Sequence, residues 1–165
     1  MNKTIQVIIT VAVVTNLALT AVILKRTSNP QAIAQNSSPA NPLPDEIDKS
    51  VISLIAESFT EKYNSGNLEE FETVFSDFAR AQMKKEDIKK NFDSLQEVFG
   101  DISKTTYSHY EFSGKQGNVK YFTLHYIAEL KEESRFGKLG KLKITISWDG
   151  TEYGIVSAFL NAGTQ

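Results

Sequence analysis

The hydrophobic period of the chain changes at Gly100, and this change constrains the fold more than any other feature. Before Gly100, apolar residues recur every three to four positions, as on one face of an α-helix. After it, they alternate with polar residues, as in a half-buried strand. A run of helices followed by a run of strands is typical of an α+β domain with helices packed on one sheet face. We therefore predict three helices followed by a curved antiparallel sheet of about four strands, together forming a cone-shaped roll.

The apolar pattern before Gly100 predicts helices over residues 45–63, from residue 67 onward, and over residues 84–99. Pro44 suits a helix start, and Gly66 and Gly100 suit helix ends because glycine readily adopts a positive φ. Asn67 with Glu70 three residues later is a capping-box arrangement. The predicted apolar faces comprise Ile47, Val51, Ile55 and Phe59 in the first helix, Leu68, Phe71, Val74, Phe75 and Phe78 in the second, and Ile88, Phe92, Leu95 and Phe99 in the third.

The strand part predicts two hairpins. The motif "GKQGN" (114–118) predicts a three-residue loop at 115–117, with Gly117 in the left-handed conformation. This loop pairs Tyr107 with His125, His109 with Thr123, and Glu111 with Tyr121. The motif "WDGT" (148–151) predicts a two-residue type I′ turn at 149–150. That turn pairs Ile146 with Tyr153, Ile144 with Ile155, and Leu142 with Ser157.

The N-terminal segment 1–26 is a candidate membrane anchor or export signal. Its residues 5–24 carry no charge, and an α-helix of 20 residues spans about 30 Å, one hydrocarbon thickness. This length, with Lys25 and Arg26 after it, favours an uncleaved anchor over cleavage after Ala34, which would leave a secreted or periplasmic protein. Residues 27–44 contain all four prolines and predict a linker, and residues 45–165 predict one exported domain.

The charge and composition of the domain exclude several functions. It has 15 basic and 20 acidic residues, a net charge of −5, which is unfavourable for binding nucleic acid. The chain has no cysteine, and therefore no thiol nucleophile or thiolate metal site. Neither a glycine-rich phosphate loop nor an HExxH or GxSxG motif occurs, so we expect no cofactor.

The segments "YNSGNLEEFETVFSD" (63–77) and "MKKEDIKKNFDSLQEVFG" (83–100), with the two hairpins, resemble the nuclear-transport-factor-2-like superfamily, the cystatin-like α+β roll. The chain looks like small bacterial members of unknown function, several of which follow an export or anchor segment. The resemblance implies a cone-shaped pocket between helices and sheet, and an outer sheet face that often dimerises. It also implies that an enzymatic relative would carry an Asp or His with a Tyr inside the pocket.

The predicted phase of the strands places five polar or aromatic residues inside the roll: Tyr110, Tyr126, Trp148, Tyr153 and Ser157. No Asp, Glu or His falls on that face, and a general base needs a titratable group near the substrate. These residues are therefore interpreted as core side chains with one satisfied polar atom each, or as the lining of a ligand pocket. We expect the protein not to be an enzyme.

The opposite sheet face predicts a partner or homodimer surface made by Tyr107, His109, Tyr121, His125 and Ile127, because aromatic residues are enriched at interfaces. Surface aromatics without a partner are an equal alternative. In the predicted register the two histidines have no third ligand, so no metal site is expected.

The sequence thus favours a non-catalytic domain, tethered to a membrane or exported, that binds a partner protein, itself or a small ligand. Two alternatives remain: a pocket enzyme of isomerase or hydrolase type on the same roll, and an accessory subunit of an envelope complex.

Overall fold

The structure is a computed structural model that describes residues 41–134 and 137–162. Within these ranges, no helix combines the length and apolar character needed to cross a membrane. The predicted anchor segment 1–26 and most of the predicted linker lie outside the described residues, so both stay predictions.

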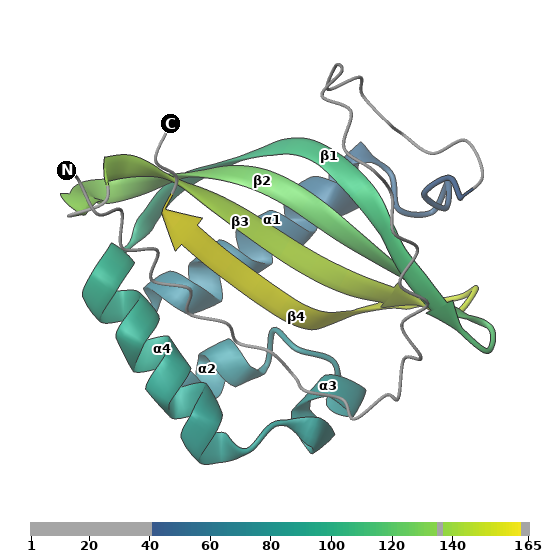
Figure 1. Ribbon diagram of the computed structural model, residues 1–165, viewed down its shortest axis with the longest axis horizontal. Coiled ribbons are helices and arrows are strands. Elements are labelled where there is room, and N and C mark those ends of the chain that lie inside the picture. Colours follow the sequence, from purple (N-terminus) through teal and green to yellow (C-terminus); the bar gives the residue numbers. More distant parts are fainter. Residues whose placement is uncertain (1–40, 135–136, 163–165) are drawn as a thin grey trace, which may run out of the picture.

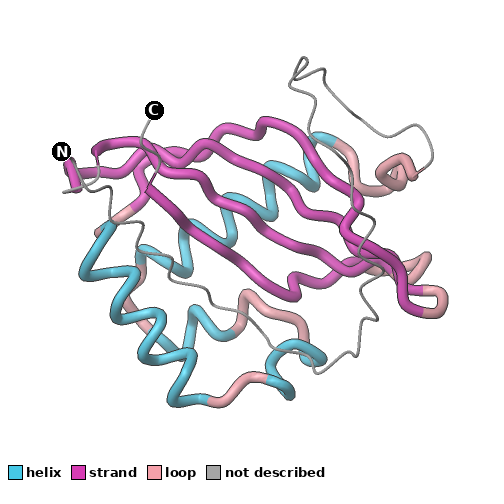
Figure 2. The backbone as a smooth tube through the Cα atoms, viewed as in Figure 1, coloured by secondary structure: helices cyan, strands magenta, loops and turns pink. Residues whose placement is uncertain are grey.

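The described chain is an α+β domain with a curved, four-stranded antiparallel sheet in the order β1-β2-β3-β4 (Figure 1). This confirms the predicted α+β class and the four-stranded antiparallel meander. The α1 helix runs along one side of the sheet (Figure 2). The helices α2, α3 and α4 lie together next to α1. The elements are α1 (Lys49–Asn64), α2 (Leu68–Glu72), α3 (Asp77–Gln82), α4 (Lys85–Phe99), β1 (Ile102–Gln116), β2 (Val119–Ser134), β3 (Gly137–Trp148) and β4 (Tyr153–Ala162).

The first helix begins later than predicted. Asp48 is its N-cap, and one carboxylate oxygen accepts hydrogen bonds from the backbone N–H groups of Ser50 and Val51 at 2.8 and 3.0 Å. The preceding residues form a turn in which the Ile47 N–H donates to the Pro44 carbonyl. A carboxylate that satisfies two free N–H groups sets a helix start more strongly than a proline. The predicted end is confirmed by Gly66, whose φ is 67°.

The second predicted helix is divided into α2 and α3. Between them Phe75 forms a parallel bridge with Ile155 of β4, and the Ser76 N–H donates to the Ile155 carbonyl at 2.9 Å. Ser76 then caps α3 by accepting from the Ala79 N–H. The axis therefore changes direction after Phe75, and Phe78, predicted to be in the core, is 59% exposed.

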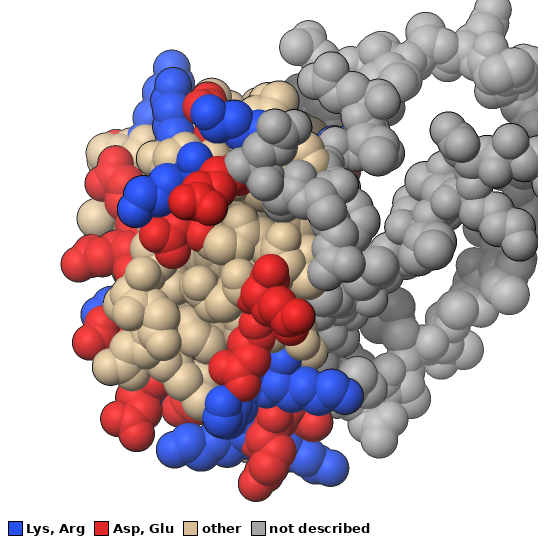
Figure 3. Space-filling view, turned by 90° about the vertical axis from the view of Figure 1, so that its left-hand side faces the viewer, with Lys and Arg blue, Asp and Glu red and all other residues tan. Residues whose placement is uncertain are grey.

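The interior of the domain is filled by apolar side chains. The predicted inward residues of α4 (Ile88, Phe92, Leu95 and Phe99) are all buried, as predicted. Among the described residues, no charged or strongly polar residue is fully buried. On the face shown in Figure 3, acidic and basic side chains are intermingled around an uncharged area, so the acidic excess forms no single patch there.

The register between β1 and β2 differs from the prediction. The turn has only two residues, since Gln116 pairs with Val119, and Gly117 has a φ of 59° as predicted. Three register shifts occur along β1, and each leaves out one serine: Ser103, Ser108 and Ser113. An extra residue on one strand of an antiparallel pair is a β-bulge. As a result, His109 lies opposite His125, and Tyr107 lies opposite Tyr126.

The register between β3 and β4 also differs. The connection is a four-residue loop at 149–152, because Trp148 pairs with Tyr153 rather than with Thr151. A further shift occurs at Val156, so Ser157 lies opposite Thr145, while Ala158 and Leu160 occupy the core positions. The prediction that Ser157 faces the interior opposite Leu142 was therefore wrong. Side chains alternate along a strand, so a single extra residue reverses the face of all that follow.

Candidate functional site

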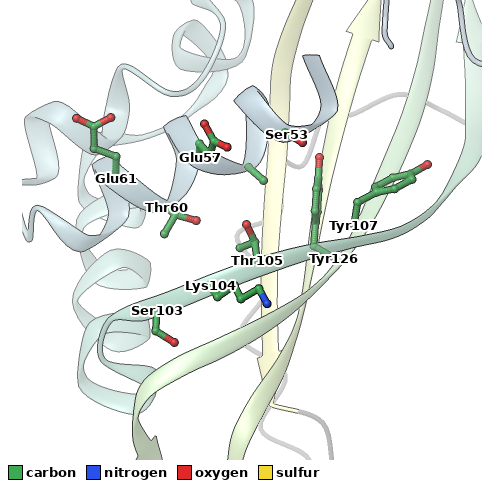
Figure 4. Close-up of a pocket in the computed structure, with 10 residues that line it drawn as sticks. Ser53, Glu57, Thr60, Glu61, Ser103, Lys104, Thr105, Tyr107 and Tyr126 are labelled. Carbon is green, nitrogen blue, oxygen red and sulfur yellow. The ribbon is translucent and has the colours of Figure 1, made fainter. Parts of the chain in front are cut away.

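A groove of about 490 Å³ lies between α1 and the first part of β1. Its α1 wall and its sheet wall face each other across the opening (Figure 4). It is lined by Ser53, Ala56, Glu57, Thr60 and Glu61 of α1, by Ser103, Lys104, Thr105 and Tyr107 of β1, and by Tyr126 of β2.

Tyr107 lies in this groove because of the register shift at Ser108. The sequence predicted Tyr107 on the outer sheet face opposite His125, but the shift places it opposite Tyr126 and on the α1 side. The two rings pack edge to face, with centroids 5.7 Å apart. Tyr107 is 36% exposed, so its ring is available to a ligand.

Tyr126 forms the floor of the groove and connects the sheet to α1. It is buried, and its hydroxyl donates a 2.9 Å hydrogen bond to the Ile52 carbonyl. Burial raises the pKa of Tyr126 well above its ordinary value, and burial also raises the pKa of Tyr107. Both phenols are therefore protonated at neutral pH and act as hydrogen-bond donors rather than as bases.

The α1 wall of the groove is hydrophilic. Ser53, Glu57 and Glu61 recur every four residues and so share one face of the helix. Across the opening, β1 supplies the ammonium group of Lys104 and the hydroxyl of Thr105. The groove thus combines hydroxyl groups, two carboxylates, one cation and two aromatic rings. These α1 residues were not predicted from the sequence, because polar residues are expected on the exposed face of any amphipathic helix, whether or not they bind a ligand.

The five residues predicted inside the roll do not form one pocket. Tyr126 and Trp148 are buried, Tyr110 is half-buried, and Tyr153 is 37% exposed. The Tyr110 hydroxyl accepts a hydrogen bond from the Leu43 N–H at 3.2 Å. Ser157 lies in register with Thr145, whose hydroxyl contacts Thr123. Of the five, only Tyr126 lines the groove.

Of the residues predicted on the outer face, Tyr107 lies on the α1 side instead, while the two histidines meet. His109 and His125 are directly opposite, and their rings stack with centroids 4.3 Å apart and planes 12° apart. Ile127 is 47% exposed. Burial lowers the pKa of His125, and this effect outweighs the nearby Glu111 carboxylate, which raises it. Whether this face forms an interface stays a prediction.

A second hollow of about 450 Å³ lies near the tips of the two hairpins. Phe78 of α3 and two sequence-predicted residues, Tyr121 and Tyr153, contribute aromatic rings to it. Tyr121 and Tyr153 were assigned to opposite sheet faces in the prediction. The β3–β4 loop and α3 bring them to the same hollow.

Comparison with known proteins leaves the family open. No protein-family model matches the chain, and no curated protein matches it. The structure of Bdellovibrio bacteriovorus Bd1075 is 14% identical with a TM-score of 0.41, covering 70% of this chain and 41% of that one. A proposed aromatic ring hydroxylase from Novosphingobium aromaticivorans is 12% identical with a TM-score of 0.43, covering 75% of this chain and 94% of that one. This chain therefore spans less than half of Bd1075, and neither likeness bears on activity.

Proposed function

We propose that this protein is a non-catalytic binding domain, exported or held at a membrane, that takes a small polyhydroxylated ligand in the groove between α1 and β1. The observation that carries the proposal is the groove itself. Its volume of about 490 Å³ lies within the range of about 300–1,000 Å³ typical of ligand pockets. Its walls offer the exposed ring of Tyr107 beside a set of hydroxyl and carboxylate groups.

The chemistry of the walls favours a sugar-like ligand. Carboxylates accept hydrogen bonds from ligand hydroxyls, and serine and threonine hydroxyls both donate and accept. An aromatic ring offers apolar contact area to the C–H face of a sugar. Glu57 and Glu61 outnumber Lys104, so an amino sugar with a positive charge should bind better than an acidic sugar.

Two features support a binding role over the pocket-enzyme alternative. The interior of the roll, where the enzyme alternative requires a hollow, is filled by apolar side chains in the described domain. In the groove, both tyrosines have raised pKa values, so neither hydroxyl is suited to act as a general base. A general base with a pKa near neutrality is what catalysis would need there.

The roll is proposed to be of the nuclear-transport-factor-2-like type, supported by the order of helices followed by a four-stranded meander. Export or tethering is proposed from the uncharged segment 5–24 and the proline-containing linker after it. Measurement of the intact mass of the cellular protein tests the tether, because a mature chain beginning at Gln35 would show cleavage.

Binding is tested by titrating the protein with neutral sugars, amino sugars and acidic sugars, and following the chemical shifts of backbone amides. We expect amino sugars to shift the resonances of residues lining the groove. Replacement of Tyr107 by alanine should weaken that binding at least about tenfold, the equivalent of about 1.4 kcal/mol. Tyr153→Ala is the matched control, because Tyr153 has nearly the same exposure, 37% against 36%, and lies outside the groove.

Two results would contradict the proposal. One is the absence of saturable shifts with every class of sugar. The other is an equal loss of binding in Tyr107→Ala and Tyr153→Ala, which would place the ligand elsewhere.

A further inference from the structure

The outer face of the sheet brings together the side chains of His109, Glu111 and His125. His109 lies directly opposite His125, and Glu111 is two residues further along β1, on the same face. In the predicted register His109 faced Thr123 and the histidines had no third ligand. The two-residue turn at 117–118 and the register shift at Ser113 bring His109 opposite His125, and the Glu111 carboxylate lies beside the pair.

The potential metal-binding atoms of the three side chains lie close to one another. The Glu111 Oε2 atom is 3.2 Å from His125 Nε2, and its Oε1 atom is 3.8 Å from His109 Nε2. One potential ligand atom from each residue lies within 4.8 Å of the other two. Ligand atoms around a tetrahedral zinc ion, with bonds of about 2.0–2.2 Å, lie about 3.3 Å apart. To bind the same ion, the exposed His109 must also turn out of its stack on His125, because the lone pair of each imidazole nitrogen lies in the plane of its ring.

Polar atoms around the cluster are arranged as expected at a metal site. The His125 side chain is only 12% exposed, and its Nε2 atom is buried with no hydrogen-bond partner among the described residues, although Glu111 is close. A buried polar atom without a partner is costly and calls for an explanation. The hydroxyl of Ser108 lies 3.0 Å from His109 Nδ1. A proton on Nδ1, donated to that hydroxyl, leaves the Nε2 lone pair free for a metal.

We propose that His109, Glu111 and His125 bind a divalent transition-metal ion of the Zn²⁺ type, at a site separate from the ligand groove. Two imidazole nitrogens and one carboxylate are a donor set suited to zinc and its neighbours, whereas Mg²⁺ and Ca²⁺ take oxygen ligands. Three protein ligands leave a fourth position for water or for a donor from outside the domain. His109 and Glu111 are 56% and 60% exposed, so that position faces solvent.

One neighbour opposes the cation. Lys143 of β3 pairs with His125, and its positive charge lies close enough to act on the imidazole. Like charges on neighbouring strands repel. Removal of this charge by Lys143→Met should therefore tighten zinc binding, whereas a purely structural cluster of side chains would show no zinc dependence at all.

The chain contains only two histidines and no cysteine, so few other side chains can compete for zinc in the test. The full-length chain, purified without a histidine tag and treated with chelator, is titrated with Zn²⁺ against a chromophoric competitor. We expect one zinc ion per chain, with no displacement by excess Mg²⁺.

Loss of an outer partner of a metal site costs about 10–100-fold in affinity. Loss of a ligand in His109→Gln or Glu111→Gln should therefore cost at least about 100-fold, and Ser108→Ala about tenfold.

The control is Glu97→Gln, which removes an exposed carboxylate on α4 and should leave zinc affinity unchanged. Circular dichroism checks that each variant is folded. His109 and Glu111 are replaced because they are exposed, whereas replacement of the largely buried His125 is more prone to unfold the domain. Absence of stoichiometric zinc binding would overturn the proposal. So would zinc affinity that is the same in wild type, His109→Gln and Glu111→Gln.

Discussion

At the scale of single residues, polar side chains set the positions where elements begin and turn. Asp48 caps α1, which starts four residues beyond the predicted position, and Asp149 holds the loop between β3 and β4. One carboxylate oxygen of Asp149 accepts hydrogen bonds from the N–H groups of Thr151 and Glu152 and from the Thr151 hydroxyl, at 2.8–2.9 Å. These bonds stabilise a four-residue loop in place of the two-residue turn that Asp-Gly usually predicts.

Asp149 should make stability depend on pH in the acid range. The backbone hydrogen bond from Glu152, followed by those from Thr151, lowers the pKa of Asp149 below its usual 3.8. A lowered carboxyl pKa contributes stability that is fully present above the unfolded-state pKa and is lost as the pH falls through the folded-state pKa. Asp149→Ala should therefore lower the urea midpoint at neutral pH, with a difference from wild type that shrinks in acid. Glu97→Gln is the control, and a difference independent of pH would contradict this role.

At the scale of elements, the contact between α3 and β4 explains why the second predicted helix is divided. A Cβ atom added to Gly154 would lie 2.8 Å from the Ser76 Cβ atom, closer than side-chain carbons approach. Glycine at 154 thus allows the chain between α2 and α3 to dock on β4, where Ser76 donates its N–H to Ile155. The apolar pattern over Val74, Phe75 and Phe78 is compatible with a continuous helix, but this docking interrupts it.

A double-mutant cycle tests this contact. Gly154→Ala alone should destabilise the domain by about 1–3 kcal/mol through overpacking. Ser76→Gly alone should cost only a few tenths of a kcal/mol, since glycine is an acceptable N-cap. The double variant should recover most of the loss, because the Ser76 Cβ is no longer present. Additive effects in chemical denaturation would show that the two residues are not coupled.

At the scale of the whole molecule, aromatic packing joins the helices into one layer against the sheet. Phe71 lies at its centre, with ring centroids 5.7 Å from Phe59, 5.5 Å from Phe75 and 4.8 Å from Phe92. The α2 helix has only five residues and would not be stable alone. The packing of Phe71 is therefore what holds α2 in place.

Phe71→Ala should lower the free energy of unfolding by about 3–5 kcal/mol, the usual cost of removing a buried phenylalanine. Phe78→Ala is the matched control, because Phe78 is 59% exposed and its loss should change stability by no more than about 0.5 kcal/mol. Urea denaturation of both variants measures the difference. Similar values for the two would mean that Phe71 does not anchor the helical layer.

Much of the architecture could be predicted from local patterns. The change of hydrophobic period at Gly100 predicted helices followed by strands, and the inward residues of α4 were predicted correctly. Positive φ values at Gly66 and Gly117 also agree with the predicted chain reversals. These features depend on short-range geometry, which a short window of sequence contains.

The sequence alone determined the fold class, the order of elements and the presence of tyrosines and histidines in β1 and β2, but the tertiary structure decided which of them meet. The shift at Ser108 places Tyr107 in the α1 groove, while the two-residue turn and the shift at Ser113 place His109 opposite His125, beside Glu111. Side chains alternate with a period of two, so one bulged residue moves neighbours to opposite faces. The position of a bulge depends on the twist of the paired strands and on what packs against them. That information lies in contacts between distant segments, which no local pattern contains.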